Sequence, residues 1–399
     1  MKKLMLLGGL RYLIPVIKAA HQEGCHVITC DNLPENIAHK YSDEYYNISI
    51  IDKEAVLKLA NSLQIDGIMS FAVDPGVVTA AYVAEKMNLP YAGSYESVKI
   101  LQNKALFREF LTLNGFNVPK AKGFISFNDA YDKIDILKWP IIVKLVDSAG
   151  SKGVIKVDHK ENLKEAFEYA KKFSFSKEVI IEEFIEKKGH SSDCDSFSLD
   201  GKLTSISFNS QYFDDEASNP YTPSAFSWPS TFTTNQEEEL KSELQRLITL
   251  LDLKTSVYNI EVRIGNDNNP YIMEFSPRGG GNRLSEMIRY GSGVDLINAA
   301  VKGALGLPVN GLKPIKFNGF WTEIILHSNI KGRFESLQID KRITNNIIEE
   351  DLWVNKGDVI KDFKGANDSI GTLVLKFETE DEMKNALNIR HELIKVAVS

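Results

Sequence analysis

The stretch that decides the fold reads Val257-Tyr-Asn-Ile-Glu-Val-Arg-Ile264, and after a polar turn it continues with Tyr271-Ile-Met-Glu-Phe275. Polar and apolar residues alternate in the first segment, which is typical of a β-strand that buries one of its faces. The turn at Asn266–Pro270 joins the two segments and predicts a hairpin. The polar residues that share one face of the first strand are Asn259, Glu261 and Arg263.

A symmetric hairpin predicts that Glu261 lies opposite Glu274 and that Asn259 lies opposite Ser276. Directly opposed side chains share a face, with Cβ atoms roughly 4.5–5.5 Å apart. Two such carboxylates repel each other unless a cation lies between them, and Mg²⁺ commonly uses one or two carboxylates together with substrate phosphates. The alternative is a pair of exposed acids on a solvated sheet face. The apolar opposite face and the glycine-rich exit at 277–281 favour a metal site.

Upstream of the hairpin, Lys144 lies inside the apolar run Pro140–Val146. A lysine in a buried strand usually has an anion to meet, although methionine would also fit such an apolar run. The following residues, 147–153, are small and glycine-rich, so their N–H groups are able to close over phosphate oxygens. An ordinary hairpin turn is the alternative for this loop. Lys144 favours the phosphate interpretation.

Further towards the N-terminus, the strand Lys3–Leu7 ends at Gly8-Gly9, and a helix ending at Gly24 leads to the strand His26–Cys30. Strands that alternate with helices predict a parallel sheet covered by helices. A dinucleotide site needs G-x-G-x-x-G, which is incomplete here. A tight turn in a βαβ unit is therefore a better interpretation than a nicotinamide site.

The remaining segments predict a small α+β lid, a long loop and a β-rich end. We expect lid strands around Gly123–Ile125, Ile141–Leu145, Val154–Val157 and Val179–Ile181. Asn209–Phe232 is polar, aromatic and rich in proline, which favours a long ordered loop, and such loops are often functional. The loop contains the aromatic residues Tyr212, Tyr221 and Trp228. Two interpretations are open for them: they line an acceptor pocket, or they are exposed loop residues. A β-rich section begins at Trp321 and closes with a helix from Glu380.

Composition excludes several classes of protein. The 399 residues carry 47 Lys+Arg and 54 Asp+Glu, a formal charge of −7 that gives no overall attraction to nucleic acid or anionic membranes. No apolar run approaches the ~20 residues of a membrane helix. Three cysteines without CxxC spacing argue against a disulfide framework or structural zinc. We expect a cytoplasmic globular protein of two or three domains.

Five motifs follow one another along the chain: Lys104, Lys144 with its glycine loop, Glu182–Ile185, Asn259-x-Glu261-x-Arg263 and Glu274-x-x-Pro277-Arg278. This ordered set, over about residues 1–320, resembles the ATP-grasp superfamily. Within it, the chain is similar to carboxylate–amine ligases related to biotin carboxylase, carbamoyl-phosphate synthetase, phosphoribosylglycinamide synthetase and L-amino-acid ligases. The implied fold is α/β and α+β, with a Rossmann-like pre-ATP-grasp domain at 1–97. An ATP-grasp domain would follow at 98–319, with its lid at about 118–188, and then a β-rich lobe at 320–399.

The resemblance also implies roles for individual residues. Lys104 and Lys144 would hold the α- and β-phosphates of ATP, and Arg278 would lie near the transferred phosphate and acyl group, with Lys144 and Arg278 as the catalytic pair. Glu261 and Glu274 would bind Mg²⁺ or Mn²⁺. The flap over the triphosphate would contain Gly150, Ser151 and Gly153. The hinge that receives adenine, partly through backbone groups, would contain Glu182, Glu183, Phe184 and Ile185.

Two positions depart from the family pattern. Ser276 stands where the family often has a third metal ligand, asparagine, and serine is a weaker ligand. Ser191 falls near the position of the usual ribose-binding acid, so the ribose contact stays open.

The resemblance implies an ATP- and Mg²⁺-dependent, ADP-forming ligase. It would join a small carboxylate, such as an amino acid, to an amine or a thiol through an acyl phosphate. Its partners would be these small molecules, with no nucleic acid and no membrane, and a homodimer is compatible with the resemblance. A phosphoribosylglycinamide synthetase-like enzyme of purine biosynthesis and a catalytically inert ATP-binding module remain as alternatives.

Overall fold

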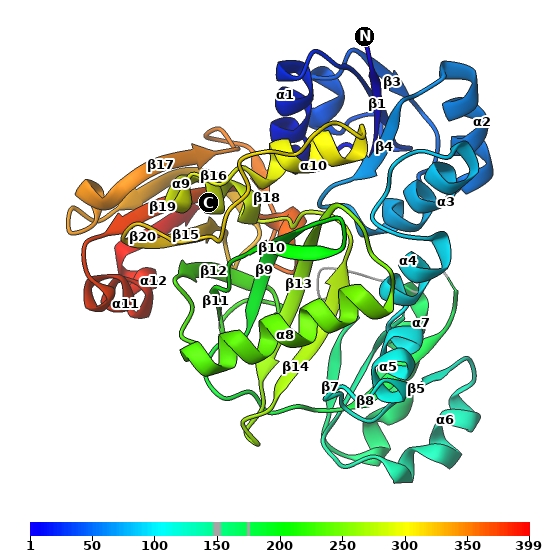
Figure 1. Cartoon of the computed structure of the whole chain (residues 1–399). Helices are drawn as coiled ribbons and strands as arrows, with labels where there is room; N and C mark the ends of the chain where they lie inside the picture. Colours follow the sequence, from blue (N-terminus) through cyan, green and yellow to red (C-terminus); the bar gives the residue numbers. More distant parts are fainter. Residues whose placement is uncertain (147–152, 174–175) are drawn as a thin grey trace.

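The computed structural model describes residues 1–146, 153–173 and 176–399 (Figure 1). Within these ranges, the strands form one parallel sheet near the N-terminus and four antiparallel sheets further along the chain. In Figure 1 the N-terminal sheet and its helices lie at the top, the small cyan subdomain at the bottom, and the C-terminal lobe at the left. The predicted mixture of α/β and α+β domains is confirmed.

The N-terminal sheet has the strand order β3-β2-β1-β4, and all three pairings are parallel. Its strands are β1 (Lys3–Leu7), β2 (His26–Cys30), β3 (Glu44–Tyr46) and β4 (Gly67–Ser70). Its helices are α1 (Ile14–Gln22), α2 (Lys53–Leu63) and α3 (Val77–Met87). Gly8 has φ +115°, a conformation that only glycine adopts freely, which agrees with the predicted tight turn.

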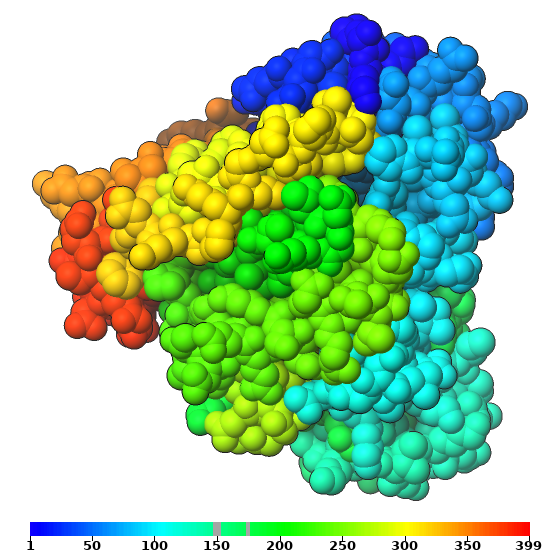
Figure 2. All heavy atoms as spheres, in the orientation of Figure 1, coloured from blue at the N-terminus to red at the C-terminus, as the bar shows by residue number. Residues whose placement is uncertain are grey.

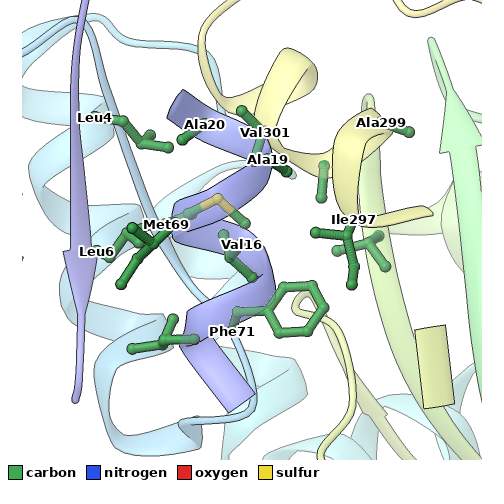
Figure 3. Close-up of a cluster of buried hydrophobic side chains, with 14 of the residues drawn as sticks. Leu4, Leu6, Val16, Ala19, Ala20, Met69, Phe71, Ile297, Ala299 and Val301 are labelled. Carbon is green, nitrogen blue, oxygen red and sulfur yellow. The ribbon is translucent and has the colours of Figure 1, made fainter. Parts of the chain in front are cut away.

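A helix from far along the chain covers one face of this sheet. Helix α10 (Leu296–Ala304) packs against α1 and the sheet, as Figure 3 shows for Val301, Ala19 and Ala20. In the space-filling view, the yellow segment around residue 300 lies directly against the blue N-terminal part (Figure 2). The N-terminal domain therefore shares a hydrophobic core with residues nearly 300 positions away.

The lid subdomain is a four-stranded antiparallel sheet in the order β5-β8-β6-β7. Its strands are β5 (Ala121–Phe124), β8 (Val179–Glu183), β6 (Ile141–Leu145) and β7 (Ile155–Val157), which confirms the strands predicted there. Helices α6 (Phe127–Lys133) and α7 (Leu163–Phe173) belong to the same subdomain. Ala130, Leu163 and Phe167 from these helices join its buried core.

The central sheet has the order β10-β9-β13-β14 and carries the predicted hairpin. Its strands are β9 (Ser192–Leu199), β10 (Lys202–Ile206), β13 (Ser256–Ile264) and β14 (Pro270–Ser276). Its nearby helices are α4 (Tyr95–Gln102), α5 (Lys104–Leu113), α8 (Thr234–Leu250) and α9 (Leu284–Ser292). Leu240, Leu244 and Leu247 of α8 are fully buried against the apolar face of the sheet.

The predicted long loop at 209–232 is wrong, because this segment supplies two strands of the C-terminal lobe. Strands β11 (Ser210–Phe213) and β12 (Pro223–Trp228) begin a sheet with the order β11-β12-β15-β19-β17. The polar residues of the segment suggested a loop, but they can be buried in a sheet when they form hydrogen bonds there. The Ser224 hydroxyl, for example, is buried and donates to the Tyr212 carbonyl at 3.3 Å. Trp228 is buried in the core beside Phe226 and Phe317, whereas Tyr221 is exposed.

The rest of the lobe is β-rich and has a helix from Glu380, as predicted, but it closes with a strand at Ile394–Val398 and not with that helix. Its other strands are β15 (Phe320–Leu326), β16 (Gly332–Ile339), β17 (Ile347–Leu352), β18 (Val359–Ile360), β19 (Gly371–Phe377) and β20 (Ile394–Val398). Helix α11 (Glu380–Asn388) starts at the capping box of Thr379 and Glu382, and α12 (Arg390–Leu393) follows. Within the described ranges, no helix is long and apolar enough to cross a membrane.

Candidate active site

The polar face of the β13–β14 hairpin forms the centre of the candidate site. The register pairs Glu261 with Glu274 and Asn259 with Ser276, as the sequence predicts. The register shifts just after Glu261, so a β-bulge follows the carboxylate pair. The side chains of Glu261 and Glu274 are 29% and 40% exposed, so both carboxylates remain within reach of a ligand.

Each of these carboxylates has a cation of its own. Glu261 Oε1 lies 2.8 Å from Arg263 Nη2, and Glu274 Oε1 lies 2.8 Å from Lys104 Nζ. Lys104 is the first residue of α5, whose N-cap is the Asn103 side chain. Burial raises the pKa of Glu274, but Lys104 and then Lys144 outweigh it, so the pKa lies below its usual value. The repulsion expected from the sequence is thus relieved by protein cations.

Sequence reasoning missed a third carboxylate in the same row. Asp193 on β9 pairs with Glu261 on the side opposite to Glu274, so three acids lie across three adjacent strands. Asn259 Nδ2 donates to Asp193 Oδ1 at 2.6 Å and to Asp195 Oδ1 at 3.2 Å. Burial, Glu261 and Asp195 raise the pKa of Asp193 to about 8. The alternation in residues 191–195 was the available signal, because it places both aspartates on one face.

Lys144 meets an anion, as expected, but that anion is a protein carboxylate. Its Nζ lies 2.6 Å from Glu182 Oε1 on the neighbouring strand β8, and both side chains are almost fully buried. Arg108 Nε binds the other oxygen of Glu182 at 3.0 Å, while Arg108 Nη1 donates to the Met273 carbonyl at 2.9 Å. Although burial raises it, Arg108 and Lys144 lower the pKa of Glu182 to about 2. Arg108 thereby ties the lid to β14.

The predicted hinge residues continue from Glu182 along the chain. The backbone N–H groups of Glu183 and Phe184 donate to the carbonyls of Lys120 and Pro140 at 2.9 and 3.1 Å. Glu183 Oε1 accepts from the backbone N–H of Lys138 at 3.0 Å. The side chain of Glu182 turns to Lys144 and Arg108, so it serves the ion-pair network. Ile185 follows the end of β8.

Arg278 and Ser276 meet a residue of the N-terminal domain that sequence reasoning did not select. Arg278 Nε and Nη2 donate to the two oxygens of Asp74 at 2.9 and 2.7 Å, and both side chains are largely buried. Ser276 Oγ donates to Asp74 Oδ1 at 3.0 Å and accepts from Gln102 Nε2 at 2.8 Å. Burial raises the pKa of Asp74, but Arg278 outweighs it and keeps the pKa low.

The other predicted positions lie at the margins of the site. Gly150 and Ser151 lie outside the described residues. Gly153 has φ +68°, and a Cβ there would come within 3.3 Å of the Leu145 side chain. Ser191 is buried, and its carbonyl accepts from the Gln211 backbone at 2.8 Å.

The described side chains supply only some of the oxygen ligands that a hard divalent cation needs. In the part of the chain that the structure describes, no group of three or more His, Cys, Asp or Glu side chains is placed to hold a metal ion. Two opposed and accessible carboxylates remain, which matches the share of ligands that Mg²⁺ takes from protein when substrate phosphates supply others.

Comparisons with known proteins agree with this geometry. A family model described as an ATP-grasp domain matches residues 137–286. The formate-dependent phosphoribosylglycinamide formyltransferase of Synechococcus sp. (strain WH7803) is 27% identical over 186 residues, 46% of this chain and 48% of that protein. The carbamoyl phosphate synthase large chain of Pseudothermotoga lettingae is 23% identical over 302 residues, 75% of this chain and 27% of that protein. The chain thus spans about half the length of these relatives or less.

Solved structures show the same fold over the whole chain. The L-amino acid ligase from Bacillus licheniformis has a TM-score of 0.83 at 19% identity, covering 100% of this chain and 99% of that one. The phosphoribosylglycinamide synthetase from Anaerococcus prevotii has a TM-score of 0.76 at 22% identity, covering 100% of both. The fold is therefore that of these multidomain α/β proteins. The family match is narrower than this likeness in fold, because the ATP-grasp domain model covers residues 137–286 of the chain.

Proposed function

We propose that the protein is an ATP- and Mg²⁺-dependent, ADP-forming ligase that joins a small carboxylate, such as an amino acid, to an amine. The observation that carries this proposal is the opposed pair Glu261 and Glu274, which lies beside Lys104 within an ATP-grasp fold. ATP with Mg²⁺ would supply the phosphoryl group that activates the carboxylate as an acyl phosphate. The amine would then displace phosphate.

The chain's own residues would mainly position the reactants and neutralise charge. Glu261 and Glu274 would hold the metal ion, while Lys104 and Lys144 would face the phosphates. Burial lowers the pKa of Lys144 below its usual value, although Glu182 at 2.6 Å opposes this effect inside the lid. Arg278, held by both oxygens of Asp74, would present a fixed positive charge to the acyl phosphate.

Replacement of one metal-binding carboxylate tests this function. ADP release should first be found by screening pairs of amino acids and small carboxylates with ATP and Mg²⁺. Glu274→Gln should then lower the rate at least about a hundredfold, because the amide is a poor ligand for Mg²⁺ and no longer pairs with Lys104. Glu350→Gln, an exposed strand glutamate in the C-terminal lobe, is the matched control and should keep the full rate.

Three results would contradict the proposal. An unchanged rate in Glu274→Gln at saturating Mg²⁺ would remove the metal assignment. ATP binding without ADP release for any substrate pair would favour the inert ATP-binding module. Release that requires a phosphorylated ribosylamine would favour the purine-type alternative.

A further inference from the structure

A cavity of about 220 Å³ opens in the C-terminal lobe. Its wall is built from the end of β15, the loop that follows it, and residues of β12, α12 and β20. In Figure 1, β15, α12 and β20 lie together at the left of the molecule. None of the residues of the candidate active site lines this cavity.

The five-stranded sheet of the lobe separates the cavity from the segment that carries Arg278. Ile324 and Leu326 of β15 line the cavity and pack in the core on one face of the sheet. Trp321 of the same strand packs with Leu284 of α9 on the other face. A ligand in the cavity therefore lies on the opposite side of β15 from α9 and from the candidate catalytic arginine.

Arg390 is a cation of the cavity wall that has no carboxylate partner. Its Nη1 donates to the Leu387 carbonyl at 3.0 Å, and its Nη2 donates to the Phe213 carbonyl and to the Ser224 hydroxyl. Among the described residues its Nε finds no hydrogen-bond partner, and this atom is not sealed from solvent. The fully buried arginines, in contrast, each bind a carboxylate, and these are Arg108, Arg278 and Arg283.

The acid that lines the cavity, Asp214, is already engaged by other donors. Its Oδ2 accepts from His327 Nε2 at 3.0 Å and from Asn329 Nδ2 at 2.9 Å. Its Oδ1 accepts from the backbone N–H of Glu216 at 2.9 Å. These hydrogen bonds, that of His327 above all, hold the pKa of Asp214 well below its usual range against the effect of burial. Asp214 therefore has little capacity left for a ligand.

The charge that remains at the cavity is positive. Burial lowers the pKa of Arg390, and Asp214 and Asp215 oppose this effect without restoring the usual value. Burial and the charge of Arg390 also lower the pKa of His391, which lines the cavity at an exposed position. An anion in this place would pair with the guanidinium and accept a hydrogen bond from the imidazole.

The rest of the wall indicates what the anionic group is attached to. Ile324, Leu326, Ile394 and Val396 present apolar surface in the same cavity as Arg390. The volume lies below the ~300–1,000 Å³ of sites for drug-sized ligands, so the ligand is small. An anion with a short aliphatic chain covers the apolar wall, whereas a bare phosphate ion leaves it in contact with water.

We propose that this cavity is a second ligand site, which binds a small aliphatic carboxylate. The carboxylate group lies between Arg390 and His391, and the carbon chain lies on Ile324, Leu326 and Ile394. The bound molecule is separate from the carboxylate that ATP would activate, because the sheet stands between the two places. The proposal does not depend on the ligase function, and its test needs no nucleotide.

Three probes test the charge and the chain of the ligand. Isovalerate carries a carboxylate and a branched chain, isovaleramide is its neutral counterpart, and inorganic phosphate is an anion without a chain. Titrations followed by ligand-detected NMR should show that isovalerate binds at least about tenfold more tightly than the other two. Equal binding of isovaleramide, tighter binding of phosphate, or no binding of isovalerate would overturn the proposal.

Variants assign the binding to the cavity. Arg390→Gln should weaken isovalerate binding about ten- to a hundredfold, the scale of a lost charge-assisted hydrogen bond, and Val396→Phe should abolish it by filling the cavity. Arg342→Gln, an exposed arginine of the same lobe that pairs with Asp340, is the matched control and should bind as the unaltered protein does. If circular dichroism shows that these two cavity variants do not fold, the exposed His391→Gln decides, with an expected loss of about two- to tenfold. Unaltered binding in any folded cavity variant would overturn the proposal.

One further variant separates this cavity from the candidate active site, which would also take a carboxylate. Arg278→Gln should leave isovalerate binding unchanged, because Arg278 lies beyond the sheet. Loss of binding in Arg278→Gln together with full binding in Arg390→Gln would place isovalerate in the active site and overturn the proposal. ADP release is measured separately, so its absence would count against the ligase function and not against the cavity.

Discussion

Lys144 shows at the residue scale how a correct prediction can have a different cause. The apolar run around it indicates a buried lysine that meets an anion, and the structure supplies Glu182 at 2.6 Å. Arg108 completes the network from a helix 74 positions earlier than Glu182 in the chain. No local pattern marks Arg108, because it lies on an ordinary amphipathic helix. A phosphate role for Lys144 stays a prediction.

From the sequence alone, Lys144→Met is expected to leave the fold as stable as before, and the ion-pair network reverses this expectation. Methionine at position 144 fits the apolar run, but Lys144→Met would leave Glu182 with Arg108 as its remaining ion-pair partner in a buried place. We expect a loss of about 1–3 kcal/mol in the free energy of unfolding, measured by urea denaturation. The control is Lys156→Met, a part-exposed lysine paired with Asp158, which should change the free energy by less than about 1 kcal/mol. Equal stability of the two variants would show that the buried pair contributes little.

The same carboxylate predicts how stability depends on pH. The folded pKa of Glu182, about 2, lies below its ordinary value of 4.5, so its stabilising effect is complete above pH 4.5. The effect is lost as the pH falls from 4.5 towards 2, since the folded state must then bind a proton it resists. Acid denaturation should therefore be steeper in the unaltered protein than in Glu182→Gln. Parallel curves would contradict the low pKa.

At the element scale, the β13–β14 hairpin was predictable and β11–β12 was not. Period-two alternation and a symmetric turn place Glu261 opposite Glu274 without any knowledge of the rest of the chain. Strand β12 instead buries serine hydroxyls within a sheet, where Ser224 donates to the Tyr212 carbonyl and Ser227 donates to the Tyr212 hydroxyl. The hydrogen bonds of these hydroxyls depend on neighbouring strands. The composition of the segment does not reveal those strands, and by itself it favours a loop.

The glycine loop after β6 gives a prediction at this scale. If residues 148–154 close over the triphosphate, a non-hydrolysable ATP analogue with Mg²⁺ should slow their amide hydrogen exchange, because the N–H groups gain phosphate partners. ADP should slow the exchange less, since the γ-phosphate is missing. Equal exchange rates with and without nucleotide would contradict the flap and favour an ordinary hairpin turn.

At the scale of the whole molecule, the segment from Ser276 to Arg283 is held from two sides. Asp74 of the N-terminal domain binds Ser276 and Arg278, while Glu349 of the C-terminal lobe binds Arg283. Helix α10 follows shortly afterwards and packs on the N-terminal sheet (Figure 3). The arrangement of the domains therefore sets the position of the candidate catalytic arginine.

A single methyl group tests this packing between distant parts of the chain. A Cβ on Gly67 of β4 would lie 2.4 Å from the Ala304 carbonyl at the end of α10, and a backbone oxygen does not move aside cheaply. Gly67→Ala should lower the free energy of unfolding by about 1–3 kcal/mol. Gly365→Ala, at an extended and open position, should change the free energy little. Both values come from urea denaturation, and equal values would contradict the close packing of α10.

The sequence by itself determined the strands of the lid, the motifs that resemble ATP-grasp proteins and the opposed carboxylates, because these depend on spacing along one or two strands. Only the tertiary structure decided the partners of those motifs: Asp74 for Arg278, Arg108 for Glu182, and Asp193 beside Glu261. These pairs join residues 204, 74 and 68 positions apart in the chain. Ion pairs and burial depend on distance in space, and no spacing rule along the chain encodes that distance.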